Sequence, residues 1–268
     1  MEYNIQKADL MRRLPAWLLD TILLIVLITG FAALWSLAFD ISAPNAEYKQ
    51  IQSQYEQQYK AEYEAANGEI PSFETEEEWN NLTEDEQNKV NEAAQAISAK
   101  VEEALSKNER IPVLVAEIFS SFLTTISLSV LCAYTILEFI VPLLLKNGQT
   151  LGKKCFGIAL MRKDGIKVTT FMVFARSILG KCTVETMLPI CLVGAAMLFG
   201  ASLWLVVAVA LMAATVILTI ATKQRTAIHD LMACTVAVDM GSQMIFDSVE
   251  EMEAHNAEIR ENVASWEA

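Results

Sequence analysis

The residues that invite a chemical hypothesis are carboxylates inside long apolar stretches. Asp20 and Glu138 each stand in such a stretch, where placing a charge in hydrocarbon costs roughly 2.5–3.5 kcal/mol. Glu138 lies about 10 Å inside the end of its stretch at Leu145, at 1.5 Å per helical residue. Because residues 138–145 include no basic residue, we expect Glu138 to be protonated or to line a polar cavity. Glu138 is therefore the strongest candidate for a carboxylate that carries protons or cations.

Asp20 lies nearer the start of its stretch and shares a helix face with Arg13, because steps of three and four residues return to one face. The two residues are about 10.5 Å apart along the helix axis, too far for a comfortable direct pair. We expect each to bond a partner elsewhere, and the candidates are Arg176, Lys153 and Asp230. Such groups form either a structural polar latch or a path for protons and cations.

Two further ionisable sites have simpler explanations. Lys181 and Glu185 are four residues apart in an apolar stretch, so they are expected to neutralise each other on one helix face. His229 stands beside Asp230 and is a candidate pH sensor with an ordinary pKa of about 6.5. For a lone histidine next to a carboxylate, a structural hydrogen-bonding role is the more common one.

The sequence contains no motif of an enzyme, a cofactor site or a metal site. Its five cysteines show no C-x-x-C spacing, and it has two histidines, too few for an obvious zinc site. Nucleophile-elbow, phosphate-loop and zinc-protease motifs are missing. Residues 148–153 are glycine-rich and end in Lys153, but they lack the phosphate-loop spacing. We expect no enzymatic activity, no cofactor and no metal.

Four apolar segments must position these groups, and they span residues 16–39, 113–145, 171–199 and 201–222. About 20 apolar residues are enough to cross a bilayer as a helix. The basic loop around Lys153 and the flank at Lys223 both favour the cytoplasm, which requires an even number of crossings between them and a turn at 200–202. We therefore predict an all-α, multi-pass protein of the plasma membrane with both termini cytoplasmic. In the alternative, 171–187 lies flat in the interface and one long helix follows.

The negative charge of the chain is concentrated in two segments, residues 41–111 and residues 239–268. The 268 residues carry a net charge of −13 and a mean hydropathy of +0.33, which together argue against a nucleic-acid partner and against one soluble domain. Acidic residues outnumber basic ones by 16 to 6 in 41–111 and by 8 to 1 in 239–268, whereas basic residues lead by 10 to 5 in 112–238. The predicted parts are therefore 1–40 with the first span, an acidic insertion 41–111, the remaining spans 112–238, and an acidic tail 239–268 that is either an amphipathic helix or a disordered tether.

The sequence pattern of the insertion 41–111 predicts that this segment forms an extracytoplasmic helical hairpin. Two stripes have helical spacing: Tyr48, Ile51, Tyr55, Tyr59 and Tyr63 in the first half, and Val90, Ala94, Ile97, Val101 and Leu105 in the second. Between them, Asn67-Gly68 and Pro71 mark a turn, and Thr83 with Glu86 has capping-box spacing. The tyrosines either pack against the aliphatic stripe or form a face that binds carbohydrate or peptide.

Three motifs taken in order identify a family. They are Arg13 to Asp20 at the entry to the first span; Asn147-Gly148-Gln149-Thr150-Leu151-Gly152-Lys153-Lys154, with Arg176 later; and Ile228-His229-Asp230 after the last span. Because it carries these three motifs in this order, the chain resembles the RDD family of small membrane proteins over residues 12–40 and 112–238. The resemblance implies Arg13, Asp20 and Asp230 as the arginine and two aspartates that name the family. The insertion 41–111 departs from the short connection expected of typical members.

Two functional hypotheses follow. The resemblance implies exchange of sodium, lithium or potassium for protons as one candidate activity, with Glu138 and Asp20 as the exchanging carboxylates. Four short spans are few for a monomeric transporter, so this hypothesis expects a homo-oligomer. The other hypothesis is a non-transporting scaffold or sensor, whose hairpin binds an extracytoplasmic protein and whose basic loop contacts anionic lipid.

Overall fold

The computed structural model describes residues 5–39, 42–73, 75–145, 147–199, 202–221 and 227–267. The chain folds as two compact units, one of Met1–Trp35 with Ile126–Ala268 and the other of Ser36–Thr125. In chain order the elements are α1 (Leu10–Ala38), α2 (Ser42–Asn67), α3 (Glu76–Asn81), α4 (Glu84–Lys107), α5 (Arg110–Tyr134), η1 (Thr135–Ile140), α6 (Val141–Leu144), α7 (Leu151–Cys155), β1 (Ile158–Arg162), α8 (Thr170–Phe174), η2 (Ala175–Met187), α9 (Leu188–Phe199), α10 (Ser202–Ala221), α11 (Ile228–Met232), β2 (Thr235–Asp239) and α12 (Val249–Glu267).

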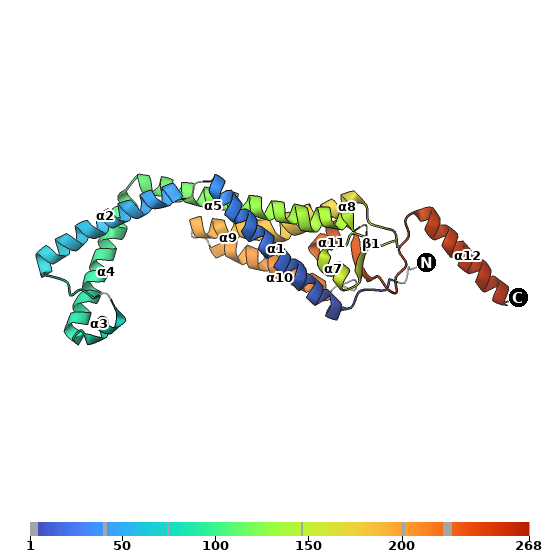
Figure 1. The fold of residues 1–268 in the computed structure, drawn as a ribbon, viewed down its shortest axis with the longest axis horizontal. Helices are drawn as coiled ribbons and strands as arrows, with labels where there is room; N and C mark the ends of the chain where they lie inside the picture. Colours follow the sequence, from blue (N-terminus) through green and yellow to red (C-terminus); the bar gives the residue numbers. More distant parts are fainter. Residues whose placement is uncertain are drawn as a thin grey trace. The chain divides into compact units, whose positions relative to one another are not determined.

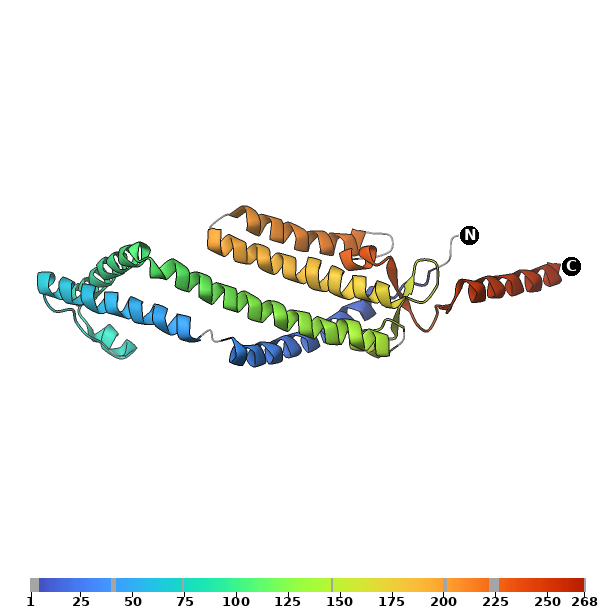
Figure 2. The same ribbon diagram turned by 90° about the horizontal axis from the view of Figure 1, so that it is seen from above.

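Long apolar helices dominate the chain. Within the described residues, three helical stretches are long and apolar enough to cross a membrane: Leu10–Ala38, Arg110–Leu144 and Thr170–Leu198. A fourth apolar helix, α10, follows them and packs antiparallel beside α9 (Figure 2). Large apolar side chains stay exposed on these helices, including Leu37 at 85%, Met197 at 80% and Ile220 at 73%. Such exposure is expected of helices whose solvent is lipid, since lipid tails are as apolar as the side chains themselves.

The prediction of an all-α fold is wrong in one respect, because the first unit contains a small antiparallel sheet. β1 pairs with β2 in the register Ile158↔Asp239, Leu160↔Ala237 and Arg162↔Thr235. Both faces of the sheet are buried: Ile158 and Leu160 pack with Ala16 of α1 on one face, and Met161 packs with Val236 and Val238 on the other. β1 lies beside α7 and α11 at one end of the unit's helices (Figure 1).

Two of the long helical stretches contain π-helical segments. η1 interrupts the α5–α6 stretch, and η2 occupies 13 residues between α8 and α9. A π-helix is rare, and its i→i+5 bonding is found mostly at functional sites, where it changes the direction in which side chains project. Glu138 lies in η1, and Arg176, Lys181 and Glu185 lie in η2. Four ionisable residues of the long helices thus lie where the helix geometry is irregular.

The second unit is a helical hairpin, as the two stripes predict. α2 packs on α4, and its stripe residues Tyr55 and Tyr59 stack with ring centroids 6.3 Å apart. Thr83 and Glu86 form the predicted capping box at the start of α4, and α2 ends at Asn67, just before Gly68 with φ +80°. The predicted aliphatic stripe of α4 is wrong at one position. It included Ala94, which is exposed, whereas the neighbouring Ala93 is buried. The short helix α3 was not predicted.

The acidic tail is helical rather than a disordered tether. α12 occupies Val249–Glu267. In the segment before α12, Asp247 forms an ion pair with Lys167 at 3.1 Å. The ring of Phe246, in the same segment, contacts the ring of His255 in α12, with centroids 5.4 Å apart. The segment that enters α12 is therefore attached to the loop after β1.

Candidate functional site: a buried polar cluster at the sheet end of the helices

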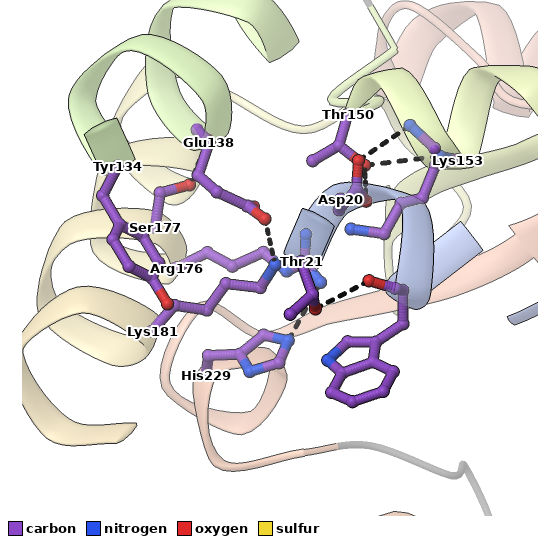
Figure 3. Close-up of polar contacts among 12 residues, drawn as sticks. Asp20, Thr21, Tyr134, Glu138, Thr150, Lys153, Arg176, Ser177, Lys181 and His229 are labelled. Carbon is purple, nitrogen blue, oxygen red and sulfur yellow. Dashed lines mark hydrogen bonds and ion pairs between the residues drawn. The ribbon is translucent and has the colours of Figure 1, made fainter. Parts of the chain in front are cut away.

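The first unit gathers ionisable side chains from five elements into one cluster. The members come from α1, η1, α7, η2 and α11, and most line one cavity. They are Asp20, Glu138, Lys153, Arg176, Lys181, Glu185, His229 and Asp230. Figure 3 labels six of them, Asp20, Glu138, Lys153, Arg176, Lys181 and His229. The sequence-derived candidates Asp20, Glu138, Lys153, Arg176 and Asp230 all belong to it, so the structure brings together residues that lie more than 200 positions apart.

Asp20 is held by α7 through hydrogen bonds. Its carboxylate accepts one from the Thr150 hydroxyl and one from the Gly152 backbone N–H at 2.7 Å. Figure 3 shows Thr150 and Asp20 facing each other across this contact. Among the described residues, none of the expected side chains Arg176, Lys153 and Asp230 hydrogen-bonds Asp20, because the start of α7 offers donors in their place. The charge of Asp20 does act on the amine of Lys153. Asp20 attaches α7 to α1.

Arg13 contacts the sheet through a backbone carbonyl. Its guanidinium donates to the carbonyl oxygen of Ala237 in β2 at 2.7 Å. This contact joins the first turn of α1 to the second strand. A strand carbonyl suits Arg13 because a guanidinium presents five N–H donors.

Glu138 does have a basic partner, contributed by another helix. Lys181 of η2 donates to Glu138 Oε1 at 2.6 Å, and the Glu138 side chain is 2% exposed. Lys181 and Glu185 form no direct ion pair in the described part of the chain, because each side chain has its bonded partner on a different element; they interact only through their charges. Among the described residues, no donor reaches Glu138 Oε2. The carboxylate is thus buried with one oxygen paired and the other open.

Arg176, His229 and their two carboxylates form a chain of contacts. Arg176 Nε donates to Asp230 Oδ1 at 2.8 Å, and its NH2 group lies 3.0 Å from His229 Nε2. Since a guanidinium can only donate, Nε2 must accept, so the proton of the neutral ring is on Nδ1. Nδ1 lies 2.8 Å from Glu185 Oε2 and donates to it. His229 therefore has the structural hydrogen-bonding role.

Burial and neighbouring charges decide the protonation states in α11. Burial of the His229 ring lowers its pKa below the ordinary value; Asp230 opposes this shift and Arg176 adds to it. Burial, the largest single effect, would raise the pKa of Asp230, but the charge and hydrogen bond of Arg176 act together with His229 and Lys153 and hold that pKa far below the usual range. At neutral pH the cluster therefore contains a neutral imidazole and an ionised Asp230.

Lys153 differs from the other cations of the cluster. Its terminal amine is completely buried, and none of the described residues accepts a hydrogen bond from it. Burial lowers the pKa of Lys153 to about 7, and the positive charges of Arg176 and Lys181 add to this effect. In Figure 3 the side chain extends from α7 past Asp20 into the cluster. Lys153 is thus a cation without a hydrogen-bond acceptor among the described residues.

We predict that Lys153 makes the stability of the protein depend on pH. Its pKa is about 7 in the folded state, against an ordinary 10.5. Between these values the unfolded chain binds more protons, so stability rises with pH over this window. In lipid-free detergent the thermal unfolding temperature, followed by circular dichroism, is expected to rise from pH 7 to pH 9.5. Lys153→Met should flatten the rise, and Lys154→Met, at an exposed position of the same helix, should keep it. An unchanged slope in Lys153→Met would contradict the assignment.

The glycine-rich loop positions α7. Gly148 has φ +60°, a conformation that favours glycine, and the Gln149 side chain donates to the Ile158 carbonyl of β1 at 2.8 Å. Thr150 caps α7 and also bonds Asp20. At Gly152 a Cβ would lie 2.2 Å from the Ala16 carbonyl oxygen, so only glycine fits. The motif therefore docks α7 between α1 and β1.

Gly180 is a site residue that the sequence patterns did not reveal. A Cβ at this position would lie 2.6 Å from His229 Cβ, so the absence of a side chain allows α11 to approach η2. Ser177 of η2 also bonds the backbone carbonyl of Glu138. A glycine next to a lysine inside an apolar helix was the available signal, but nothing local shows which element packs against it.

A cavity of about 600 Å³ lies beside the cluster. Its ionisable lining consists of four cations, Arg13, Lys153, Arg176 and Lys181; three carboxylates, Asp20, Glu185 and Asp230; and His229. Glu138 is not among the lining residues, so Lys181 separates it from the cavity. In the described part of the chain, no three His, Cys, Asp or Glu residues are grouped to hold a metal ion.

These features define the class of the protein: a helical membrane protein whose long helices meet a small sheet and a buried ion-pair cluster at one end. The model of the RDD family matches residues 111–234, which is consistent with an RDD family protein. This match confirms the resemblance inferred from the three motifs. It includes the loop motif, Arg176 and Asp230, and it begins after Arg13 and Asp20. Comparisons with curated proteins and with solved structures found no match.

Proposed function

We propose that this RDD family protein exchanges a monovalent cation for a proton across the plasma membrane, with the Glu138–Lys181 pair as the exchange site. The observation that carries the proposal is the position of Lys181, which binds Glu138 at 2.6 Å and also lines the cavity. The ammonium of Lys181 binds the Glu138 carboxylate at the position that a mobile cation would otherwise take. A mobile cation that enters through the cavity meets this ammonium before it can reach Glu138.

The proposed exchange conserves charge. When Lys181 releases a proton, its amine becomes neutral and Glu138 is left without a counter-ion. A monovalent cation then binds the carboxylate, for which the open Oε2 supplies an additional ligand atom. Protonation of Lys181 restores the ion pair and expels the cation. One cation therefore moves for each proton in the opposite direction, and the buried site carries no net charge in either state, which avoids the cost of an uncompensated charge in hydrocarbon.

The proposed topology has four spans and both termini in the cytoplasm. Three helices have the required length and hydropathy, and α10 supplies the fourth crossing. The basic residues of 146–167 and of 223–225 favour the cytoplasm, and this places the α2–α4 hairpin outside. Four spans give one protomer few helices around its cluster, so we propose a homo-oligomer as the working unit and no enzymatic activity.

Removal of the Glu138 charge tests the proposal. In proteoliposomes with an imposed proton gradient, the parent protein is expected to exchange sodium, lithium or potassium for protons, and Glu138→Gln should reduce this flux at least tenfold. Glu117→Gln is a matched control, because Glu117 lies on the same helical stretch but half-exposed and paired with Arg110. Flux that survives Glu138→Gln would refute the site. No flux under any gradient would refute transport and leave a scaffold whose hairpin binds a partner.

A further inference from the structure

The cavity of about 600 Å³ has two chemically different sides. One side presents the ionisable groups of the polar cluster. The other is formed by apolar side chains of α1 and α10, among them Leu14, Trp17, Val216 and Ile220. Pockets of about 300–1,000 Å³ are typical of ligand sites. A ligand that fits both sides must be amphipathic.

The apolar side of the cavity is continuous with the membrane-facing surface. Trp17 is 62% exposed, Val216 57% and Ile220 73%, and all three lie on helices that are apolar along their length. In a membrane these side chains contact acyl chains, and tryptophan prefers the level of the headgroups. The cavity is therefore accessible from the lipid, at the depth where headgroups meet the hydrocarbon.

On the polar side, every cation except Lys153 has a hydrogen-bond acceptor among the described residues. Arg176 is bound to Asp230, and Glu185 accepts from the neutral His229. Lys181 is bound to Glu138, and Asp20 is satisfied by Thr150 and Gly152. Arg13 donates to the Ala237 carbonyl. The buried Lys153 amine, in contrast, has no acceptor among the described residues. Burying an ammonium without an acceptor is costly, and an oxyanion in the cavity would remove that cost.

We propose that the cavity binds a membrane phospholipid, with the phosphate on the Lys153 amine and the acyl chains lying along Trp17 of α1 and along Val216 and Ile220 of α10. A phosphate offers several oxygens to a compact ammonium, and such charge-assisted hydrogen bonds are among the strongest in proteins. The cavity volume holds the headgroup and the first part of the chains, and the rest extends into the bilayer. The lipid site shares its cavity with the proposed exchange, but the two are tested separately, because lipid binding is measured without a gradient.

Lipid binding by the detergent-solubilised protein tests the proposal. The probes are phosphatidylglycerol, phosphatidylcholine, diacylglycerol with the same chains, and inorganic phosphate, with bound lipid counted by native mass spectrometry and stability followed by thermal unfolding. Both phospholipids are expected to bind at least tenfold tighter than diacylglycerol and to raise the unfolding temperature. Equal binding of diacylglycerol would refute the phosphate contact. A full thermal shift from inorganic phosphate alone, with no addition from the phospholipids, would refute lipid as the source of the phosphate.

A pair of lysine variants assigns the contact to a residue. Lys153→Met should abolish the preference for phospholipid over diacylglycerol, whereas Lys154→Met, exposed on the same short helix, should keep it. Lys153→Gln provides a second replacement if the methionine variant does not fold, and the lipid preference of the parent protein needs no variant at all. Tenfold selectivity retained in both Lys153 variants would overturn the assignment. Flux measurements do not enter this test, so the two proposals can fail separately.

Discussion

Replacing Gly152 by alanine is expected to prevent α7 from docking and to destabilise the first unit by at least about 3 kcal/mol, the upper range for an overpacked core position. The new Cβ would lie 2.2 Å from the Ala16 carbonyl oxygen and 2.8 Å from Asp20 Oδ1. The nearer atom is backbone of a long helix and cannot rotate away. The substitution would also break the Gly152 N–H bond to Asp20. Thermal unfolding in detergent, combined with the yield of monodisperse protein, measures the effect.

Gly30 provides the matched control. It also lies in a helix, α1, and a Cβ there would have no atom within 4 Å. Gly30→Ala should therefore be neutral or slightly stabilising, since alanine loses less backbone entropy than glycine in a helix. If Gly152→Ala and Gly30→Ala had similar unfolding temperatures, the close approach of α7 to α1 would be wrong.

Replacing Arg176 by methionine is expected to cost about 3–5 kcal/mol, because it leaves the Asp230 carboxylate buried without its counter-ion. The side chains of the pair are only 5% and 8% exposed. The variant also removes the donor to His229 Nε2. A double variant, Arg176→Met with Asp230→Leu, should recover at least half of the loss, because no charge then remains unpaired. Chemical or thermal unfolding in detergent measures both variants.

An exposed pair in the same unit serves as the comparison. Arg162 and Asp164 are bonded at 2.6 Å but are 37% and 45% exposed, and such surface pairs contribute roughly 0–1 kcal/mol. Arg162→Met should therefore change stability little. A loss from Arg176→Met no larger than that from Arg162→Met would show that the buried pair does not hold α11 to η2.

Arg13, Asp20 and Asp230, which the resemblance implies as the name residues of the family, each hold two elements of this chain together. Arg13 joins α1 to β2, Asp20 joins α1 to α7, and Asp230 joins α11 to η2. These contacts correspond to the polar latch, one of the two alternatives open from the sequence. Each residue links a long helix to a short element of the sheet end. The proposed exchange depends instead on Glu138 and Lys181, which do not belong to the three.

Local patterns predicted most of the fold. The four apolar stretches coincide with the observed helices to within a few residues, except that α1 begins at Leu10, earlier than residue 16. The capping box at Thr83 and the end of α2 before Gly68 also agree. The sheet was missed because each strand has only five residues, and the paired strands are separated by three helical stretches along the chain. Short apolar runs do not distinguish a strand from a buried helix turn.

The sequence by itself determined that this is a helical membrane protein with motifs that resemble the RDD family, because hydropathy, helical spacing and capping motifs are properties of neighbouring residues. It also identified most of the ionisable residues of the cluster, since charges in apolar stretches are conspicuous. Only the tertiary structure decided their partners. Lys181 binds Glu138, 43 residues away, and Asp20 accepts from Gly152, 132 residues away. A side chain bonds the nearest donor or acceptor in space, and which group is nearest depends on how the helices pack.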